Sequence, residues 1–121
     1  MYSKSDSDPF SGEGLANRYS LTQMDLNGDG MRLAIAGEID IANVEAFTDE
    51  LRSLCEGANG QVTLDLRDCR FIDSTGIRAL MALAQERQAR RRTLKLAGLR
   101  GEPLRVLEVS GVLDSGLFVN S

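Results

Sequence analysis

The 121-residue chain has no histidine, only two cysteines and no long hydrophobic run. Without histidine it cannot form a Ser-His-Asp triad, a Cys-His pair or an imidazole metal site. No apolar stretch reaches membrane-spanning length, and the first residues lack the apolar core of a signal peptide. We therefore expect a cytoplasmic protein without a metal site and without a segment that inserts into a membrane.

Motifs for nucleotide binding and catalysis are also missing. The chain has no Gly-x-x-x-x-Gly-Lys-Ser/Thr loop, no glycine-rich dinucleotide turn and no base beside a nucleophile. Its formal net charge is -4, from 18 acidic and 14 basic residues, which lacks the basic excess of nucleic-acid-binding proteins. We predict a protein that is not an enzyme, uses no cofactor and does not bind nucleic acid directly.

The length and composition predict one globular domain with a short N-terminal arm. A hydrophobic fraction of 42% and a charged fraction of 26% are ordinary for a globular protein of this size. Residues 1–17 are rich in Ser, Gly and Asp, so we predict a disordered arm followed by a domain over residues 18–121. Cys55, on a helical apolar face, and Cys69, in a predicted loop, are interpreted as buried small hydrophobic residues rather than a disulfide.

The first two strand patterns flank the turn signal NGDG at residues 27–30, which predicts a hairpin. The pattern DxNxDG at residues 25–30 also matches the first half of a calcium-binding loop. The twelfth position of such a loop would be Ala36, which cannot ligate calcium, and both flanks resemble strands rather than helices. The hairpin turn is therefore the favoured interpretation.

Hydrophobic periodicity predicts the order β-β-α-β-α-β-α-β. The expected strands are residues 19–26, 31–36, 62–66, 93–97 and 117–119. Of the three expected helices, the first has Asp40 as its N-cap, the second begins at Ser74, and the third begins at Pro103 and ends at Gly111. The arginine-rich stretch 87–92 is interpreted as a solvated helix end. Strand-helix-strand units imply a parallel part of the sheet, and the opening hairpin adds an antiparallel edge.

Ser74 directly precedes the apolar face of the second helix, at the position that an N-cap occupies. Its hydroxyl would lie beside free backbone N–H groups, which favour negative charge. Position alone leaves two interpretations open, a plain cap and a phosphorylation site. Asp40 and Ser74 both open helices that follow strands, so we expect them at the same edge of the domain.

Three motifs of the chain resemble the STAS domain, the fold of bacterial anti-sigma factor antagonists. They are GEID at residues 37–40, LDL at 64–66 with FIDSTGI at 71–77, and VL at 106–107 with SGVL at 110–113 and LF at 117–118. The resemblance covers roughly residues 18–119. It implies an α/β fold with a mixed, mostly parallel sheet, an antiparallel N-terminal hairpin and helices packed against the sheet.

The resemblance also implies a regulatory role. Ser74 would be the phosphorylated residue, with Thr75 at most a minor site. The implied partner-binding surface consists of Asp40, Asp73, Ser74, Thr75, Gly76, Ile77 and Arg78. In this family the unphosphorylated protein binds an anti-sigma factor that is also its serine kinase, so a sigma factor is released. A metal-dependent, PP2C-like serine phosphatase restores the active form. The alternative is a STAS subunit of a lipid-transport ABC complex or of a larger signalling scaffold.

Overall fold

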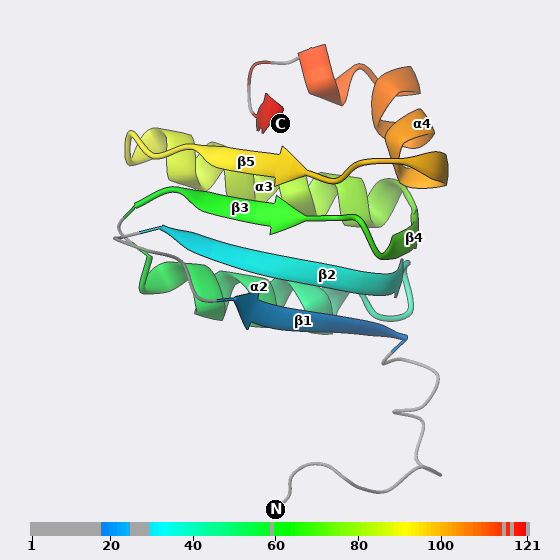
Figure 1. Cartoon of the computed structure of the whole chain (residues 1–121), viewed down its shortest axis with the longest axis horizontal. Coiled ribbons are helices and arrows are strands. Elements are labelled where there is room, and N and C mark those ends of the chain that lie inside the picture. The colour runs from blue at the N-terminus through cyan, green and yellow to red at the C-terminus, as the bar shows by residue number, and fades with distance from the viewer. Residues whose placement is uncertain (1–17, 25–29, 59, 115, 117, 121) are drawn as a thin grey trace, which may run out of the picture.

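The structure is a computed structural model that describes residues 18–24, 30–58, 60–114, 116 and 118–120 (Figure 1). The elements in chain order are β1 (Tyr19–Met24), β2 (Met31–Ile39), α2 (Val44–Glu56), β3 (Val62–Asp65), β4 (Cys69–Ile72), α3 (Ser74–Ala89), β5 (Leu94–Ala97), α4 (Gly101–Val109), the 3-10 helix η1 (Val112–Asp114) and β6 (Phe118–Asn120). The predicted arm, residues 1–17, and most of the predicted hairpin turn with its calcium alternative, residues 25–29, lie outside the described residues.

The described strands form one six-stranded sheet in the order β1-β2-β3-β5-β6, with β4 paired to β2. β1 and β2 are antiparallel, and every other pair is parallel. Helices connect β2 to β3, β4 to β5 and β5 to β6, as the alternation of strand and helix patterns predicted, whereas only a short turn connects β3 to β4. The expected α/β fold, with a mostly parallel sheet and an antiparallel N-terminal hairpin, is therefore confirmed.

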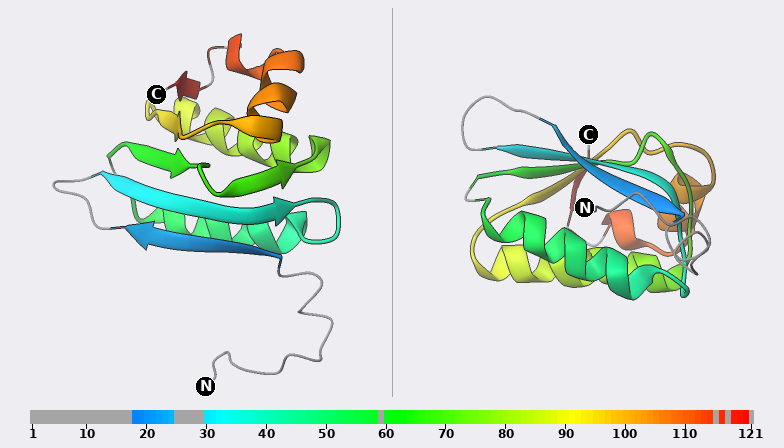
Figure 2. Two further views of the ribbon diagram at one scale, coloured as in Figure 1. Left: turned by 45° about the vertical axis from the view of Figure 1, so that its right-hand side comes forward. Right: turned by 90° about the horizontal axis from the view of Figure 1, so that it is seen from below.

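α2 and α3 cover one face of this sheet (Figure 2). The alternation in β2 sends Leu33 and Ile35 toward the helices, where both are almost completely buried. α2 contributes Phe47 to the same core, and its ring packs nearly perpendicular to that of Tyr19, with the ring centroids 5.5 Å apart. No described helix covers the other face of the sheet. None of the described helices is both long and apolar enough to cross a membrane.

One strand was not predicted. Residues 69–72, expected to be a loop, form β4, so Cys69 lies in a strand and is buried, as is Cys55. β2 is long enough to pair with β3 over its first half and with β4 over its second half. The register shifts between Gly37 and Glu38, where the partner strand changes. α4 begins at Gly101 rather than at Pro103, because a residue without an N–H is tolerated throughout the first helical turn.

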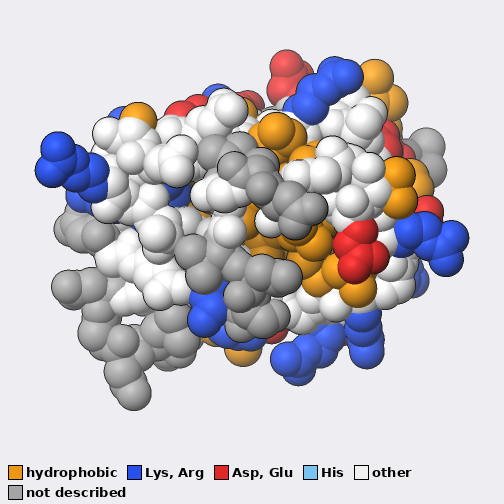
Figure 3. Space-filling model, turned by 90° about the horizontal axis from the view of Figure 1, so that it is seen from above, with side chains coloured by type: hydrophobic (Ala, Val, Ile, Leu, Met, Phe, Trp, Pro, Cys, Tyr) orange, Lys and Arg blue, Asp and Glu red, His pale blue; other side chains and the backbone are white. Residues whose placement is uncertain are grey.

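α4 and η1 lie together at one side of the sheet, next to β6. Seen from this side, hydrophobic side chains gather near the middle of the face (Figure 3). Val109 of α4 is 81% exposed, so this side of the domain carries some apolar surface. α4 also contacts β4, and Nε of its cap residue Arg100 donates to the carbonyl of Arg67 at 3.1 Å, in the turn between β3 and β4.

Candidate functional site

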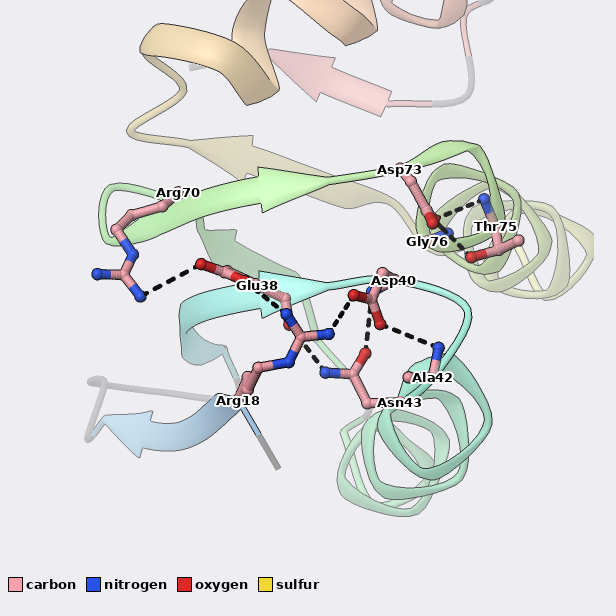
Figure 4. A network of polar contacts seen from close by, with 9 residues as sticks. All are labelled: Arg18, Glu38, Asp40, Ala42, Asn43, Arg70, Asp73, Thr75 and Gly76. Atoms are coloured by element: carbon pink, nitrogen blue, oxygen red, sulfur yellow. Dashed lines mark hydrogen bonds and ion pairs between the residues drawn. The ribbon is translucent and has the colours of Figure 1, made fainter. Parts of the chain in front are cut away.

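The carboxyl ends of β2 and β4 lie side by side (Figure 4). Ile39 pairs with Ile72 in parallel register, and the Asp73 N–H donates to the Ile39 carbonyl at 3.1 Å. Asp40 and Asp73 are the residues that follow these two strands. The prediction that the two sequence motifs meet at one edge of the domain is therefore confirmed.

The N-cap of α3 is Asp73, so the prediction of Ser74 as N-cap is wrong. Asp73 has an extended backbone, and its Oδ1 accepts from the N–H groups of Thr75 at 2.9 Å and Gly76 at 3.2 Å. The same oxygen accepts from the Thr75 hydroxyl at 2.5 Å. Ser74 is the first residue of the helix. Because the carboxylate already binds the N–H groups of Thr75 and Gly76, Ser74 is not the cap of this helix.

The Ser74 side chain is exposed and makes no hydrogen bond within the described part of the chain. Its hydroxyl therefore faces solvent at the first position of a 16-residue helix. Thr75 differs from it, because its hydroxyl is bound to Asp73 and its side chain is half-buried. Of the two neighbouring hydroxyls, only that of Ser74 is both accessible and uncommitted.

Asp73 is held in its ionised form. Partial burial opposes the charge, but hydrogen bonds from the Thr75 hydroxyl and from the N–H groups of Gly76, Thr75 and Ile41 outweigh it. They lower the pKa of Asp73 below its ordinary value of 3.8.

Gly76 and Ile77 position the helix rather than form its exposed surface. A Cβ at Gly76 would lie 2.6 Å from Cγ1 of Ile72 and 3.0 Å from Cγ2 of Ile39, so only glycine lets α3 start this close to both strands. Ile77 is 5% exposed and belongs to the core. These two residues, expected on the partner-binding surface, lie beneath it. Arg78 is exposed.

Asp40 organises a turn and is not the N-cap of α2, which corrects the prediction. α2 begins at Val44 after a turn of three residues, with Asn43 in the cap position. Asp40 Oδ1 accepts from the Ala42 N–H at 2.9 Å, and the Asp40 N–H donates to Oδ1 of Asn43 at 2.9 Å. Asn43, which the sequence analysis missed, is 1% exposed and donates through Nδ2 to the Glu38 carbonyl at 2.9 Å.

Arg18 is a second residue that the sequence analysis missed. Its guanidinium forms ion pairs with Glu38, at 2.7 Å, and with Asp40 (Figure 4). The hydrogen bond from Arg18 is the main cause that lowers the pKa of Asp40. Gly37 makes room for this arrangement, since its φ is +97° and a Cβ would meet the Arg18 carbonyl oxygen at 2.1 Å. The glycine of GEID is thus required by the backbone.

We call the residues that follow β2 and β4 and those at the start of α3 the switch surface. It comprises Asp40, Ile41, Asp73, Ser74, Thr75 and Arg78. Two ionised carboxylates lie at the ends of neighbouring strands, and Ile41, which is 76% exposed, adds an apolar side chain beside them. The surface has an exposed hydroxyl, negative charge and an apolar side chain.

Residues 22–119 match the sequence model of the family described as "Mlab, STAS domain". The chain belongs to the STAS domain family. It is 31% identical over 94 residues to BtrV of Bordetella bronchiseptica, described as a candidate anti-sigma factor antagonist, and the match covers 77% of this chain and 81% of BtrV.

Solved structures show the same STAS fold. An anti-sigma factor antagonist from Mycobacterium paratuberculosis superposes with a TM-score of 0.68 at 17% identity, covering 84% of this chain and 85% of that one. The phosphorylated form of the Bacillus cell fate determinant SpoIIAA superposes with a TM-score of 0.57 at 17% identity, covering 84% of this chain and 91% of that one. The STAS fold is therefore shown by sequence and by structure.

Proposed function

We propose that this STAS protein is an anti-sigma factor antagonist controlled by phosphorylation of Ser74. The unphosphorylated form binds an anti-sigma factor that is also a serine kinase, and the bound sigma factor is thereby released. Phosphorylation ends the complex, and a PP2C-like serine phosphatase restores the active form. The protein acts in the cytoplasm by binding, without catalysing a reaction itself. Two observations support this role: the chain is similar to an anti-sigma factor antagonist, and its FIDSTGI motif at residues 71–77 resembles the motif of that family.

The observation that carries the proposal is the state of the Ser74 hydroxyl. It is exposed at the first position of α3 and forms no described hydrogen bond, while Asp73 alone caps the helix. A kinase can therefore modify Ser74 without removing an interaction that the fold needs. That SpoIIAA exists in a phosphorylated form with this fold agrees with such a modification.

The charge of a phosphate explains how the switch works locally. Phosphorylation adds about -1.5 to -2 charges at neutral pH. The N–H groups at the start of α3 favour negative charge there, so the fold tolerates the group. A partner with an acidic group ~5 Å from the phosphate is repelled by about 3 kcal/mol at an effective dielectric constant near 20, roughly a hundredfold in affinity.

The proposed binding surface is the switch surface. Asp40 and Asp73 are held ionised and in fixed positions by Arg18 and by the start of α3, so they offer a preorganised acidic contact. Ile41 offers an exposed apolar side chain at the same place. A partner that fits would donate hydrogen bonds to the carboxylates, present an apolar pocket to Ile41 and place an acidic group near Ser74, where a phosphate would be repelled.

Co-purification and phosphorylation mapping test the function. The unphosphorylated full chain is used as bait in an extract of its source cells, and the captured proteins are identified by mass spectrometry. We expect a kinase-like anti-sigma factor that transfers one phosphate from ATP to Ser74. The Thr75→Ala variant should still be labelled, and Ser74→Ala should not. Capture of an ATPase transport subunit instead, or labelling confined to Thr75, would contradict the proposal.

A further inference from the structure

Arg78 is the only basic residue of the switch surface, in which Asp40 and Asp73 carry negative charge. Its side chain is exposed, one turn along α3 from Ser74. Among the residues that the structure describes, none forms a hydrogen bond or an ion pair with the Arg78 side chain. The folded protein therefore leaves this guanidinium free to bind another group.

The position of Arg78 on α3 directs its side chain toward Ser74. On the surface of a helix, a side chain reaches the residues three and four positions away, which here are Ser74, Thr75, Met81 and Ala82. None of these four is charged. Because helix side chains lean toward the N-terminus, we expect the guanidinium of Arg78 to lie over the turn that contains Ser74. Ser74 and Arg78 are both exposed, so the two side chains share the outer face of the helix.

A phosphate on Ser74 would need a nearby positive charge. Asp73 directly precedes it and is held ionised by its hydrogen bonds, so this carboxylate repels a phosphate there. The guanidinium of Arg18 is already engaged by Glu38 and Asp40 (Figure 4). The guanidinium of Arg78 is therefore the cation of this surface that can offset the added charge.

We propose that Arg78 binds the phosphate of phosphorylated Ser74 within α3, and that phosphorylation thereby withdraws the charge of Arg78 from the switch surface. The inference rests on the proposed phosphorylation of Ser74 and adds the residue that receives the phosphate. A guanidinium donates N–H groups in a planar fork, which suits two oxygens of one phosphate. A negative group four residues before a positive one is also the favourable order for an ion pair along a helix.

This ion pair makes phosphorylation change the switch surface in two ways. In the unphosphorylated form, the free guanidinium of Arg78 can pair with an acidic group that a partner places near Ser74. In the phosphorylated form, the phosphate occupies that guanidinium and repels the same acidic group. A partner therefore loses an attractive contact at the place where it meets a new repulsion.

A ³¹P NMR titration of the full chain tests the ion pair. Phosphoserine is placed at position 74 during synthesis by suppression of an amber codon, so that neither a kinase nor a partner is needed. The titration gives the pKa of the second ionisation of the phosphate, which is ordinarily about 6. We expect Arg78→Ala to raise this pKa by about 0.3, because the dianion loses a helical ion pair. Arg78→Lys keeps the charge and should lie between the two. Thermal melts check that each variant is folded.

Arg90→Ala is the matched control, because it removes the same charge from an exposed arginine at the far end of α3. The two positions are about 24 Å apart along the helix, beyond the screening length of about 8 Å at physiological salt, so the pKa should change by less than about 0.1. The proposal is overturned if Arg78→Ala leaves the pKa within about 0.1 of the unmutated phosphoprotein, or if Arg90→Ala raises it equally. These outcomes concern Arg78 alone, since the kinase-labelling experiment tests the antagonist function separately.

Discussion

The N-cap of α3 gives a direct stability test of the site, because the structure assigns capping to Asp73 and not to Ser74. Asp73→Ala removes the acceptor of the Thr75 and Gly76 N–H groups and of the Thr75 hydroxyl. We expect the free energy of unfolding to fall by about 1–2 kcal/mol, the upper part of the range for N-caps. For a domain of about 100 residues, Tm then falls by about 5–10 °C. Ser74→Ala changes an exposed side chain and should stay within about 0.5 kcal/mol of wild type.

Urea and thermal unfolding at pH 7, followed by circular dichroism, measure both effects. Asp73→Asn is the control that keeps a capping oxygen, and it should lie within about 0.5 kcal/mol of wild type. The reasoning is refuted if Ser74→Ala destabilises the protein as much as Asp73→Ala does. In that case the serine hydroxyl would be the cap in solution and would not be available to a kinase without a loss of stability.

Three further predictions concern stability and the N-terminal arm. Folding lowers the pKa of Asp73, so this carboxylate stabilises the folded protein above its unfolded-state pKa, and the stabilisation is lost as the pH falls through its folded-state pKa. In urea titrations below about pH 4, Asp73→Asn should therefore lose less stability than the wild-type protein does. Gly76→Ala should lower Tm, because the close contact of the new Cβ with Ile72 costs about 1–3 kcal/mol, whereas the better helix propensity of alanine stabilises by only about 1 kcal/mol. Gly57→Ala is the control and should not lower Tm, because no atom lies near its Cβ. Deleting residues 1–17 should leave Tm and partner affinity nearly unchanged in melts and calorimetry, and a large drop in either would show that the arm contributes.

The elements with a clear periodic pattern were predictable from sequence. The alternation in β2 and the helical face that includes Phe47 and Leu51 place the core correctly. β4 was missed because it has only four residues, with buried ends and an exposed middle, which matches neither the alternating nor the continuous apolar pattern. It forms a strand because β2 extends beyond β3 and offers free backbone groups for pairing.

The candidate site was predictable in place but not in detail. Asp73, Ser74 and Thr75 are all suitable N-caps, and the sequence does not show where the preceding strand ends. The end of β4 at Ile72 decides in favour of Asp73. Arg18 could not be found from sequence, since its ion-pair partners lie 20 and 22 residues away and meet it only through the pairing of β1 with β2.

The affinity of the anti-sigma factor for the two forms of this protein tests the central claim most directly. Calorimetry would compare the unphosphorylated protein, the protein phosphorylated at Ser74 and the Ser74→Ala variant, each with the co-purifying anti-sigma factor. We predict that the unphosphorylated protein and Ser74→Ala bind with similar affinity, and that phosphorylation weakens binding by about a hundredfold. Equal affinities for the phosphorylated and unphosphorylated protein would contradict the account.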